Sequence, residues 1–266
     1  MSAPSTIEQA TDLPSLTVRN LSKAFGGVKA VRDVSFDLAE GELLALIGPN
    51  GAGKSTCFNM LNGQIPADSG SVRLAGEELL GYAPAEIWRR GVGRTFQITA
   101  TFPSMTVAEN VAMVLMSEQR ELFSFFRSAT HRHRDKAMEL LDLVGMTGQA
   151  DRPCGVLSYG DLKRVELAVA LGNTPRVLLM DEPTAGMAPR ERLELMGLAA
   201  RLVRDLGISV LFTEHDMDIV FGHADRIIVL SRGALIAEGN AEQIRNDPLV
   251  LKTYLGEGQI YGQAED

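Results

Sequence analysis

The sequence has little of what secreted, disulfide-bonded or membrane-spanning proteins require. Its two cysteines, Cys57 and Cys154, are too few and too far apart for a disulfide framework or a zinc site. No apolar run reaches the length that crosses a bilayer. The polar residues 1–14 lack the basic and apolar regions of a signal peptide. We therefore expect a cytoplasmic globular protein in which Cys57 packs inside a helix.

Positive charge is also scarce. The 266 residues include 26 Lys and Arg against 34 Asp and Glu, which gives a net charge of −8. Proteins that bind nucleic acid through its phosphates normally carry a basic surface, so nucleic acid is not an expected partner. The short basic cluster at residues 131–134 has no acidic or cysteine ligands beside it. We interpret this cluster as a solvated helix face or loop rather than a metal or nucleic-acid site.

The clearest positive feature is a phosphate-binding loop. Residues 48–56 read GPNGAGKST and fit the pattern G-x-x-x-x-G-K-[ST]. The apolar run at residues 43–47 predicts a buried strand before the loop, and the residues after it can continue as a helix. Glycines let backbone N–H groups turn toward an anion, and a helix N-terminus adds partial positive charge. The expected phosphate ligands are Gly48, Pro49, Asn50, Gly51, Ala52, Gly53, Lys54, Ser55 and Thr56.

Within this loop, the Lys54 side chain is expected to reach the β- and γ-phosphates, and Ser55 is expected to hold Mg²⁺. A second group of candidates follows the apolar run at residues 176–180. Asp181 ends that predicted strand and is expected to be the second Mg²⁺ contact. Glu182 follows at once and would orient a water toward the γ-phosphate. The alternative is an ordinary acidic pair at the end of a strand.

The remaining chain divides into three kinds of segment. Alternating apolar residues predict strands at 16–20, 34–38 and 71–75. Residues 98–175 are mostly helical in pattern, with capping boxes beginning at Thr106 and at Ser158. A strand at 208–213, a hairpin at 226–238 and two short helices complete the chain. We expect tails at 1–14 and 257–266 and one domain between them.

Five motifs in this order resemble the nucleotide-binding subunit of an ABC transporter. They are the phosphate loop, Gln97 in the run RTFQ, residues 157–161 (LSYGD, where the family most often has LSGGQ), Asp181-Glu182, and His215 in the run TEHD. The resemblance covers residues 15–256. It implies an α/β fold with a P-loop NTPase core, a mixed or parallel sheet flanked by helices. It also implies an antiparallel β subdomain and a helical subdomain inserted at about residues 98–175.

The resemblance also implies a role for each matching residue, with ATP and Mg²⁺ as cofactors. Phe25 resembles the aromatic that stacks on adenine, and Gln97 resembles the residue that contacts Mg²⁺ and the attacking water. Ser158 and Gly160 resemble the groups that bind the γ-phosphate held by the other subunit. His215 resembles the switch that contacts the γ-phosphate. The alternatives are a core aromatic for Phe25, a polar loop residue for Gln97 and a capped strand end for His215.

The partners follow from the same resemblance. It implies a head-to-tail dimer with a second ABC ATPase subunit, either a paralogue or a second copy, with ATP at the interface. It implies two integral-membrane permease subunits and, indirectly, a periplasmic solute-binding protein. The protein would therefore lie at the cytoplasmic face of the inner membrane.

Departures from the common pattern narrow the subfamily. Tyr159 and Asp161 alter the signature, and AGMA at residues 185–188 replaces the more frequent SALD. With the run EHDMD, the C-terminal residues 246–256 and the insert at 117–135, they resemble the branched-chain amino acid uptake ATPase. Its relatives also serve urea, short amides and aromatic acids, so the solute stays open. The alternatives are a lipopolysaccharide-type exporter ATPase and a soluble ABC ATPase that acts on DNA or ribosomes.

A membrane-facing groove can also be predicted. The segment at residues 98–105 carries no charge and includes Ile98, Phe102 and Met105. Depleted charge with apolar anchors is typical of the centre of a protein interface. We expect a permease to dock here, beside Gln97. The alternative is that these side chains pack inside the helical subdomain.

Overall fold

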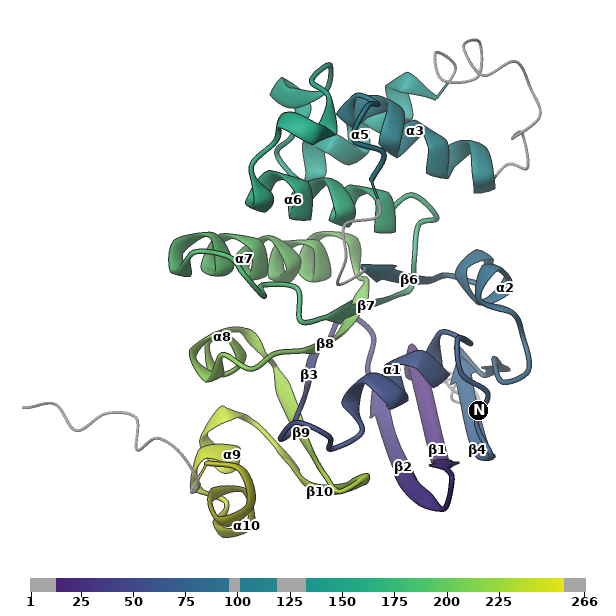
Figure 1. Ribbon diagram of the computed structural model, residues 1–266, viewed down its shortest axis with the longest axis vertical. Coiled ribbons are helices and arrows are strands. Elements are labelled where there is room, and N and C mark those ends of the chain that lie inside the picture. Colours follow the sequence, from purple (N-terminus) through teal and green to yellow (C-terminus); the bar gives the residue numbers. More distant parts are fainter. Residues whose placement is uncertain (1–12, 96–100, 119–132, 256–266) are drawn as a thin grey trace, which may run out of the picture.

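The computed structural model describes residues 13–95, 101–118 and 133–255, and within them the chain is organised around a six-stranded sheet (Figure 1). The strand order is β10-β9-β3-β8-β7-β6. Neighbours from β9 to β6 are parallel, and β10 is antiparallel to β9. The strands are β3 (Leu43–Ile47), β6 (Val92–Thr95), β7 (Val177–Asp181), β8 (Ser209–Thr213), β9 (Arg226–Ser231) and β10 (Ala234–Gly239). This sheet confirms the predicted α/β class.

Both faces of the sheet are covered, because its central strands are apolar on both sides. Every residue of β3, β7 and β8 is buried. In β3, Leu44 and Leu46 join the core beside α1, whereas Leu43, Ala45 and Ile47 join the core on the other face. Such continuous runs are typical of parallel strands. The helices of this part are α1 (Lys54–Leu61), α7 (Pro189–Leu206), α8 (Met217–His223), α9 (Ala241–Asn246) and α10 (Pro248–Val250), followed by a π-helical turn (Leu251–Leu255).

A second, antiparallel sheet packs on the α1 side of the core. Its order within the described residues is β2-β1-β4-β5. The strands are β1 (Leu16–Phe25), β2 (Val28–Leu38), β4 (Ser69–Leu74) and β5 (Glu77–Glu78). β1 and β2 pair as far as Phe25 and Val28, so they are longer than the predicted strands. Register shifts along this pair let the strands continue where the apolar alternation breaks down.

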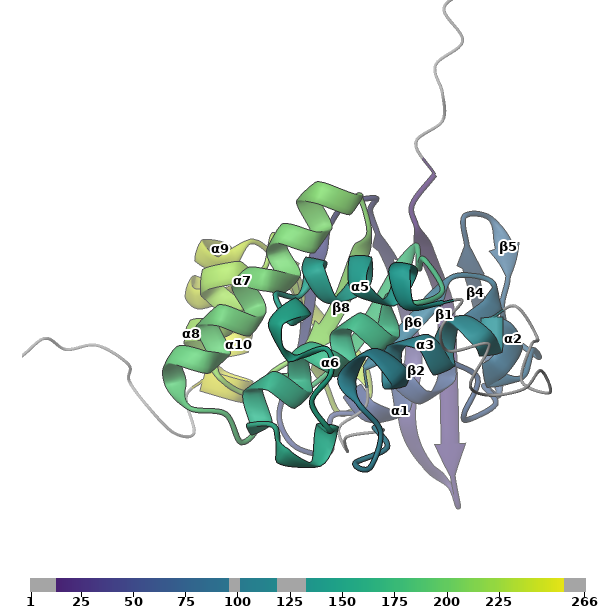
Figure 2. The same ribbon diagram turned by 90° about the horizontal axis from the view of Figure 1, so that it is seen from above.

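The helical part contains α3 (Val107–Glu118), α5 (Arg134–Leu143) and α6 (Tyr159–Ala170), with short 3₁₀ turns at Thr147–Gln149 and Cys154–Val156. Figures 1 and 2 show these helices grouped together, with α6 beside α7 of the core. The capping box at Thr106 is confirmed, because Glu109 N donates to Thr106 Oγ1 at 3.2 Å and Thr106 N donates to Glu109 Oε2 at 2.8 Å.

The interpretation of residues 131–134 as a solvated cluster was wrong for His133, which is buried. Its carbonyl accepts the N–H of Ala137 at 2.9 Å, so this residue is the N-cap of α5. Residues 131 and 132 lie outside the described ranges. Arg134 does reach the surface, where its Nη2 lies 2.7 Å from Asp151 Oδ1.

The sequence prediction omits β5 and α8, and it also omits two elements that lead to the helical part, α2 (Pro84–Arg89) and β6. Both are too short for a periodic pattern to identify, and β6 contains a glycine and an arginine. The tertiary structure forms this strand, because its residues pair with the fully buried β7. Through β6 the chain reaches the edge of the sheet where the helical part begins. Nowhere in the described ranges is there a helix long and apolar enough to cross a bilayer.

Candidate functional site

The phosphate loop joins β3 to α1 and has room only for glycine at two of its positions. Gly48 and Gly53 have φ angles of 150° and 107°. A Cβ on Gly48 would lie 2.0 Å from the carbonyl oxygen of Leu230, and a Cβ on Gly53 would lie 2.3 Å from that of Ala30. Side chains at these two positions would therefore push β9 and β2 away from the loop. The loop can form its cradle because neighbouring backbone approaches it so closely.

The Lys54 side chain is held inside this loop. Its Nζ donates hydrogen bonds to the carbonyl oxygens of Gly48 at 2.7 Å and Pro49 at 3.2 Å. Burial lowers the pKa of Lys54, and the negative charges of Glu182 and Asp181 partly oppose that shift. The ammonium of Lys54 and the carboxylates of Asp181 and Glu182, at the end of β7, therefore attract one another.

Asp181 lies at the carboxyl end of β7, the end of a parallel sheet where ligands bind in this class of fold. Its Oδ1 accepts a hydrogen bond from Thr213 Oγ1 at 2.7 Å, and its Oδ2 accepts one from Arg94 Nη2 at 3.3 Å. Thr213 ends β8 and Arg94 belongs to β6, so the two neighbouring strands hold both carboxylate oxygens. The side chain of Asp181 is nine per cent exposed.

Glu182 has a backbone conformation that is uncommon for its residue type. Its φ angle is 48°, in the left-handed region, where a residue other than glycine is strained. Its N–H lies 3.2 Å from the carbonyl oxygen and 3.0 Å from Oγ1 of Thr213. Its Oε1 lies 2.9 Å from Nε2 of His215, which follows β8. The side chains of Glu182 and His215 are 25% and 44% exposed, so both can reach a ligand.

Glu214, the residue before His215, is buried. Its Oε1 accepts hydrogen bonds from the N–H of Thr184 at 2.9 Å and from Thr184 Oγ1 at 2.6 Å. Its Oε2 accepts the N–H of His215 at 3.2 Å. One carboxylate therefore connects the loop after Glu182 to the residue that contacts Glu182.

The arrangement brings together a phosphate cradle, a buried lysine, an aspartate at a strand end and a glutamate that contacts a histidine. A family model described as "ABC transporter" matches residues 31–185. The chain belongs to the ABC transporter family. A second model, described as "Branched-chain amino acid ATP-binding cassette transporter", matches residues 234–259. The chain is thus an ABC ATPase, whose ATP hydrolysis is coupled to transport.

Two curated relatives are similar over nearly their whole length. The branched-chain amino acid transport ATP-binding protein BraF of Pseudomonas aeruginosa is 41% identical over 254 residues, covering 92% of this chain and 98% of the relative. The protein LivG of Escherichia coli is 41% identical over 251 residues, with the same coverage. A nucleotide-free ATP-binding cassette of known structure has a TM-score of 0.82 at 34% identity, covering 91% of this chain and 99% of that one.

A further solved structure describes a dimer. It is the post-hydrolysis state of the ATP-binding cassette MJ0796 bound to ADP and Pi, with a TM-score of 0.72 and 26% identity. The match covers 85% of this chain and 98% of that one. The resemblance inferred from the motifs is confirmed by these comparisons.

The signature of this ABC ATPase lies at the start of α6. Ser158 is the N-cap residue, and its side chain accepts the N–H of Asp161 at 3.1 Å. Gly160 faces Glu191, because a Cβ added there would lie 3.0 Å from Glu191 Oε1. A surface hollow of about 200 Å³ opens at this point. None of the described residues that line it belongs to the phosphate loop, so the signature and the loop of one chain form separate surfaces.

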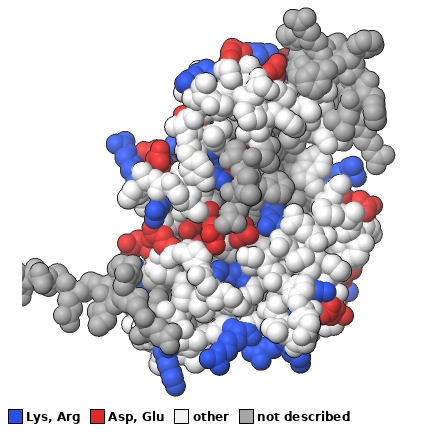
Figure 3. Space-filling view, viewed as in Figure 1, with Lys and Arg blue, Asp and Glu red and all other residues white. Residues whose placement is uncertain are grey.

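Phe25 lies at the end of β1 and is 47% exposed, so it is not the core aromatic of the alternative interpretation. Lys23 Nζ lies 5.5 Å from the centre of its ring. Figure 3 shows Lys and Arg side chains gathered over the tips of the β1–β2 and β9–β10 hairpins, and acidic side chains over the region of β7, β8 and α8. Gln97, which the sequence predicts as a catalytic and metal-contacting residue, lies outside the described residues.

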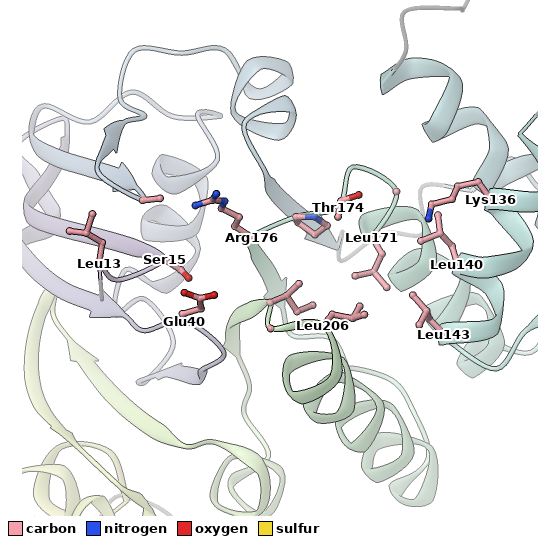
Figure 4. A pocket seen from close by; sticks show the side chains of 15 residues that line it. Leu13, Ser15, Glu40, Lys136, Leu140, Leu143, Leu171, Thr174, Arg176 and Leu206 are labelled. Carbon is pink, nitrogen blue, oxygen red and sulfur yellow. The ribbon is translucent and has the colours of Figure 1, made fainter. Parts of the chain in front are cut away.

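A hollow with a volume of about 640 Å³ lies at a different place (Figure 4). Its lining includes Pro175 and Arg176 before β7 and Ile208 before β8. These are the amino ends of the parallel strands, whereas Asp181 marks the carboxyl end. Leu140 and Leu143 of α5 and Leu206 of α7 line it beside Lys136 and Arg176, and its lining includes neither the phosphate loop nor Asp181 and Glu182.

Sequence reasoning missed three residues that hold the site together, namely Arg94, Thr213 and Glu214. All three lie inside motifs that were recognised for another residue, Arg94 in RTFQ and both Thr213 and Glu214 in TEHD. A polar residue beside a motif is usually a solvent-exposed one, so the sequence carries no sign that these side chains turn inward. Their role becomes visible only when β6, β7 and β8 are seen to end side by side.

Proposed function

We propose that this chain binds Mg²⁺–ATP at the phosphate loop and hydrolyses it with Glu182 as the residue that orients and polarises the attacking water. The observation that carries this proposal is the convergence of Lys54, Asp181, Glu182 and His215 at the carboxyl edge of the sheet. The glycine positions support phosphate binding, because a side chain at Gly48 or Gly53 would fill the cradle. Phe25 is the proposed adenine contact, exposed at the end of β1.

The donor set also fits Mg²⁺. Ser55 at the start of α1 offers a hydroxyl, Asp181 offers a carboxylate, and Gln97 is the further candidate ligand. Mg²⁺ is usually bound by one or two protein oxygens together with substrate phosphates and waters. In keeping with that mode, the described residues contain no group of three acidic, histidine or cysteine side chains that could hold a metal alone. The metal would neutralise charge on the β- and γ-phosphates.

The chain's own residues divide the remaining work. The Lys54 Nζ would exchange its bonds to the Gly48 and Pro49 carbonyls for phosphate oxygens. The contact with His215 would fix the Glu182 carboxylate beside the γ-phosphate. The strained backbone of Glu182 is held by Thr213, so the carboxylate is positioned before ATP arrives. His215, more exposed than Glu182, would turn between Glu182 and the γ-phosphate.

The second subunit is proposed to complete the site. Ser158 caps α6 and presents the N-terminus of that helix, which favours an anion. Because the signature hollow and the phosphate loop are separate surfaces of one chain, Ser158 and Gly160 would contact ATP bound to a partner ATPase. The dimeric structure of the similar cassette MJ0796 supports a dimer, whose arrangement we propose to be head to tail. The partner is a second copy or a paralogue.

The membrane partners are proposed to be two permeases that dock beside Phe102. This side chain is 53% exposed, and that of Val156 is 60% exposed. Their backbones adjoin, because Gly155, next to Val156, donates its N–H to the carbonyl oxygen of Pro103, next to Phe102, at 2.9 Å. Two apolar side chains therefore project from adjoining backbone at the helical part. Docking there would place the protein at the cytoplasmic face of the inner membrane, with a periplasmic solute-binding protein acting through the permeases.

The proposed solutes are branched-chain amino acids or related small amides and acids. The matches to BraF and LivG and the C-terminal family model support this class. The test is to purify the tagged chain from membranes with its copurifying permeases and to reconstitute the complex in liposomes. ATP should drive uptake of labelled leucine, isoleucine or valine with the cognate binding protein, and the Glu182→Gln complex should not. Copurification with lipopolysaccharide-export proteins, with ribosomes or with DNA would contradict the proposal.

A further inference from the structure

Arg94 is a partly buried cation that contacts three segments of the nucleotide site. It lies in β6, and its side chain is only 13% exposed. Nη1 donates to Asn59 Oδ1 at 2.8 Å and to Gln64 Oε1 at 3.1 Å. Nη2 donates to Asp181 Oδ2 at 3.3 Å. Asn59 belongs to α1, Gln64 to the segment after it, and Asp181 to the end of β7.

The contact with Asn59 matters because of where that residue lies on α1. Ser55, a proposed Mg²⁺ contact, is four residues earlier on the same helix. Residues four apart lie on the same face of a helix, one turn from each other. Asn59 therefore lies on the same face of α1 as Ser55, one helical turn later. Through Arg94, this turn is tied to Asp181, the other proposed Mg²⁺ contact.

A guanidinium suits this task better than an ammonium. Its planar fork can direct separate N–H groups at the amide oxygens of Asn59 and Gln64 and at the carboxylate of Asp181 at the same time. The Nε atom of Arg94 is buried with no hydrogen-bond partner, so the side chain makes its hydrogen bonds through Nη1 and Nη2. Burial lowers the pKa of Arg94 and the charge of Asp181 raises it. Desolvating this guanidinium therefore costs free energy, and its attraction to the Asp181 carboxylate offsets that cost.

We propose that Arg94 is a positioning residue that fixes the carboxylate of Asp181 relative to Ser55, so that both Mg²⁺ contacts are in place before nucleotide binds. This inference rests on the proposed roles of Asp181 and Ser55. Thr213 holds Oδ1 and Arg94 holds Oδ2, which leaves the carboxylate one orientation. Groups that orient a metal ligand from behind typically change metal affinity by about 10-fold or more when removed.

Simple charge repulsion gives the opposite expectation. Arg94 is a cation near a divalent metal, so removing it would strengthen Mg²⁺ binding if charge alone mattered. Positioning predicts weaker Mg²⁺ binding instead. The sign of the change therefore separates the two accounts.

The experiment is a titration of the purified full-length chain with a fluorescent ATP analogue, in EDTA and across a range of Mg²⁺ concentrations. In Arg94→Met, the Mg²⁺ concentration for half-maximal effect should rise by about 10-fold. Binding in EDTA should stay within about two-fold of wild type, because the phosphate loop is untouched. In Arg94→Lys this Mg²⁺ concentration should lie between those of wild type and Arg94→Met, since a lysine ammonium keeps one of the contacts that the guanidinium makes. Arg90→Met is the matched control, because Arg90 stacks on Tyr82 3.9 Å away and does not contact Asp181.

Two further variants keep the test decisive if Arg94→Met does not fold. Asn59→Ala removes one anchor of Arg94 without touching Asp181, so it should shift the Mg²⁺ dependence in the same direction by a smaller factor. Asp181→Asn is the reference for the underlying role. If Asp181→Asn leaves the Mg²⁺ dependence unchanged, the proposed function of Asp181 is wrong. Suppose instead that Asp181→Asn does shift the Mg²⁺ dependence. The inference about Arg94 is then overturned if the Arg94 variants leave the Mg²⁺ dependence unchanged, bind Mg²⁺ more tightly, or bind the ATP analogue equally weakly in EDTA.

Discussion

The Nε2 atom of His215 lies 2.9 Å from Oε1 of Glu182, although the two residues are 33 positions apart in the chain. The contact exists because β7 and β8 are parallel neighbours, and β7 ends directly before Glu182 while β8 ends two residues before His215. It lies at the open edge of the sheet, where the side chain of His215 is more exposed than that of Glu182. A histidine at this position can hold the glutamate ready and can leave it when a phosphate arrives.

The first prediction concerns Glu182→Gln. The amide has the shape of the carboxylate but is a poor base, so ATP binding should persist while hydrolysis falls by about 10²-fold or more, the lower range for a lost acid–base group. ATP hydrolysis by the assembled transporter and nucleotide binding by the isolated chain would be measured in parallel. Glu77→Gln, an exposed change on β5, is the control. Turnover near the wild-type value would show that Glu182 does not act on the attacking water.

A second prediction concerns Glu214→Gln. The wild-type carboxylate accepts three hydrogen bonds, whereas an amide nitrogen would face the N–H of His215 or the donors of Thr184. Leaving a buried donor unpaired costs about 1–3 kcal/mol. The free energy of unfolding in urea should fall by that amount, and turnover should drop because His215 is no longer fixed. Unchanged unfolding together with unchanged turnover would mean that this connection is dispensable.

The third prediction is for Lys54→Met. Loss of the ammonium removes the charge that would bind the β- and γ-phosphates, so ATP titration should show weak binding or none. The folded state of the wild type lowers the pKa of Lys54, so below that pKa the buried charge destabilises the protein. This penalty should shrink as pH rises toward the lysine range, and urea unfolding should show the trend in wild type but not in Lys54→Met. ATP affinity equal to that of wild type would contradict the phosphate-loop assignment.

Local patterns in the sequence were sufficient for much of this fold. The strand at residues 43–47 has the predicted bounds, and a helix follows the glycine motif as predicted, because an apolar run and a glycine motif are local signals; the helix begins at Lys54, inside the motif. Pro189 and Gly207 mark the two ends of α7, as their restricted and permissive backbones predict. The site residues are harder, since their contacts join distant strands. Nothing near Arg94 in the sequence indicates Asp181, 87 residues away, as its partner.

The last prediction tests where the permease docks. Phe102 is 53% exposed, but its backbone is firmly held, because Asn110 Oδ1 accepts its N–H at 2.7 Å and Asn110 Nδ2 donates to its carbonyl oxygen at 3.2 Å. The alternative that Phe102 packs inside the helical part is therefore wrong. A fixed backbone that presents an exposed aromatic ring suits an anchor, since little backbone freedom is lost on binding.

Phe102→Ala should weaken assembly with the permeases by about 1–3 kcal/mol, while folding and ATP binding of the isolated chain stay unchanged. The measurement is the affinity of the purified chain for permease-containing membranes. Leu206→Ala is the matched control, because Leu206 is 45% exposed and lies at the amino-end side of the sheet, away from the proposed groove. Equal loss in both variants would indicate general destabilisation. Normal assembly and transport by Phe102→Ala would show that the permease binds elsewhere, because the loop that Asn110 holds would then present its ring to solvent only.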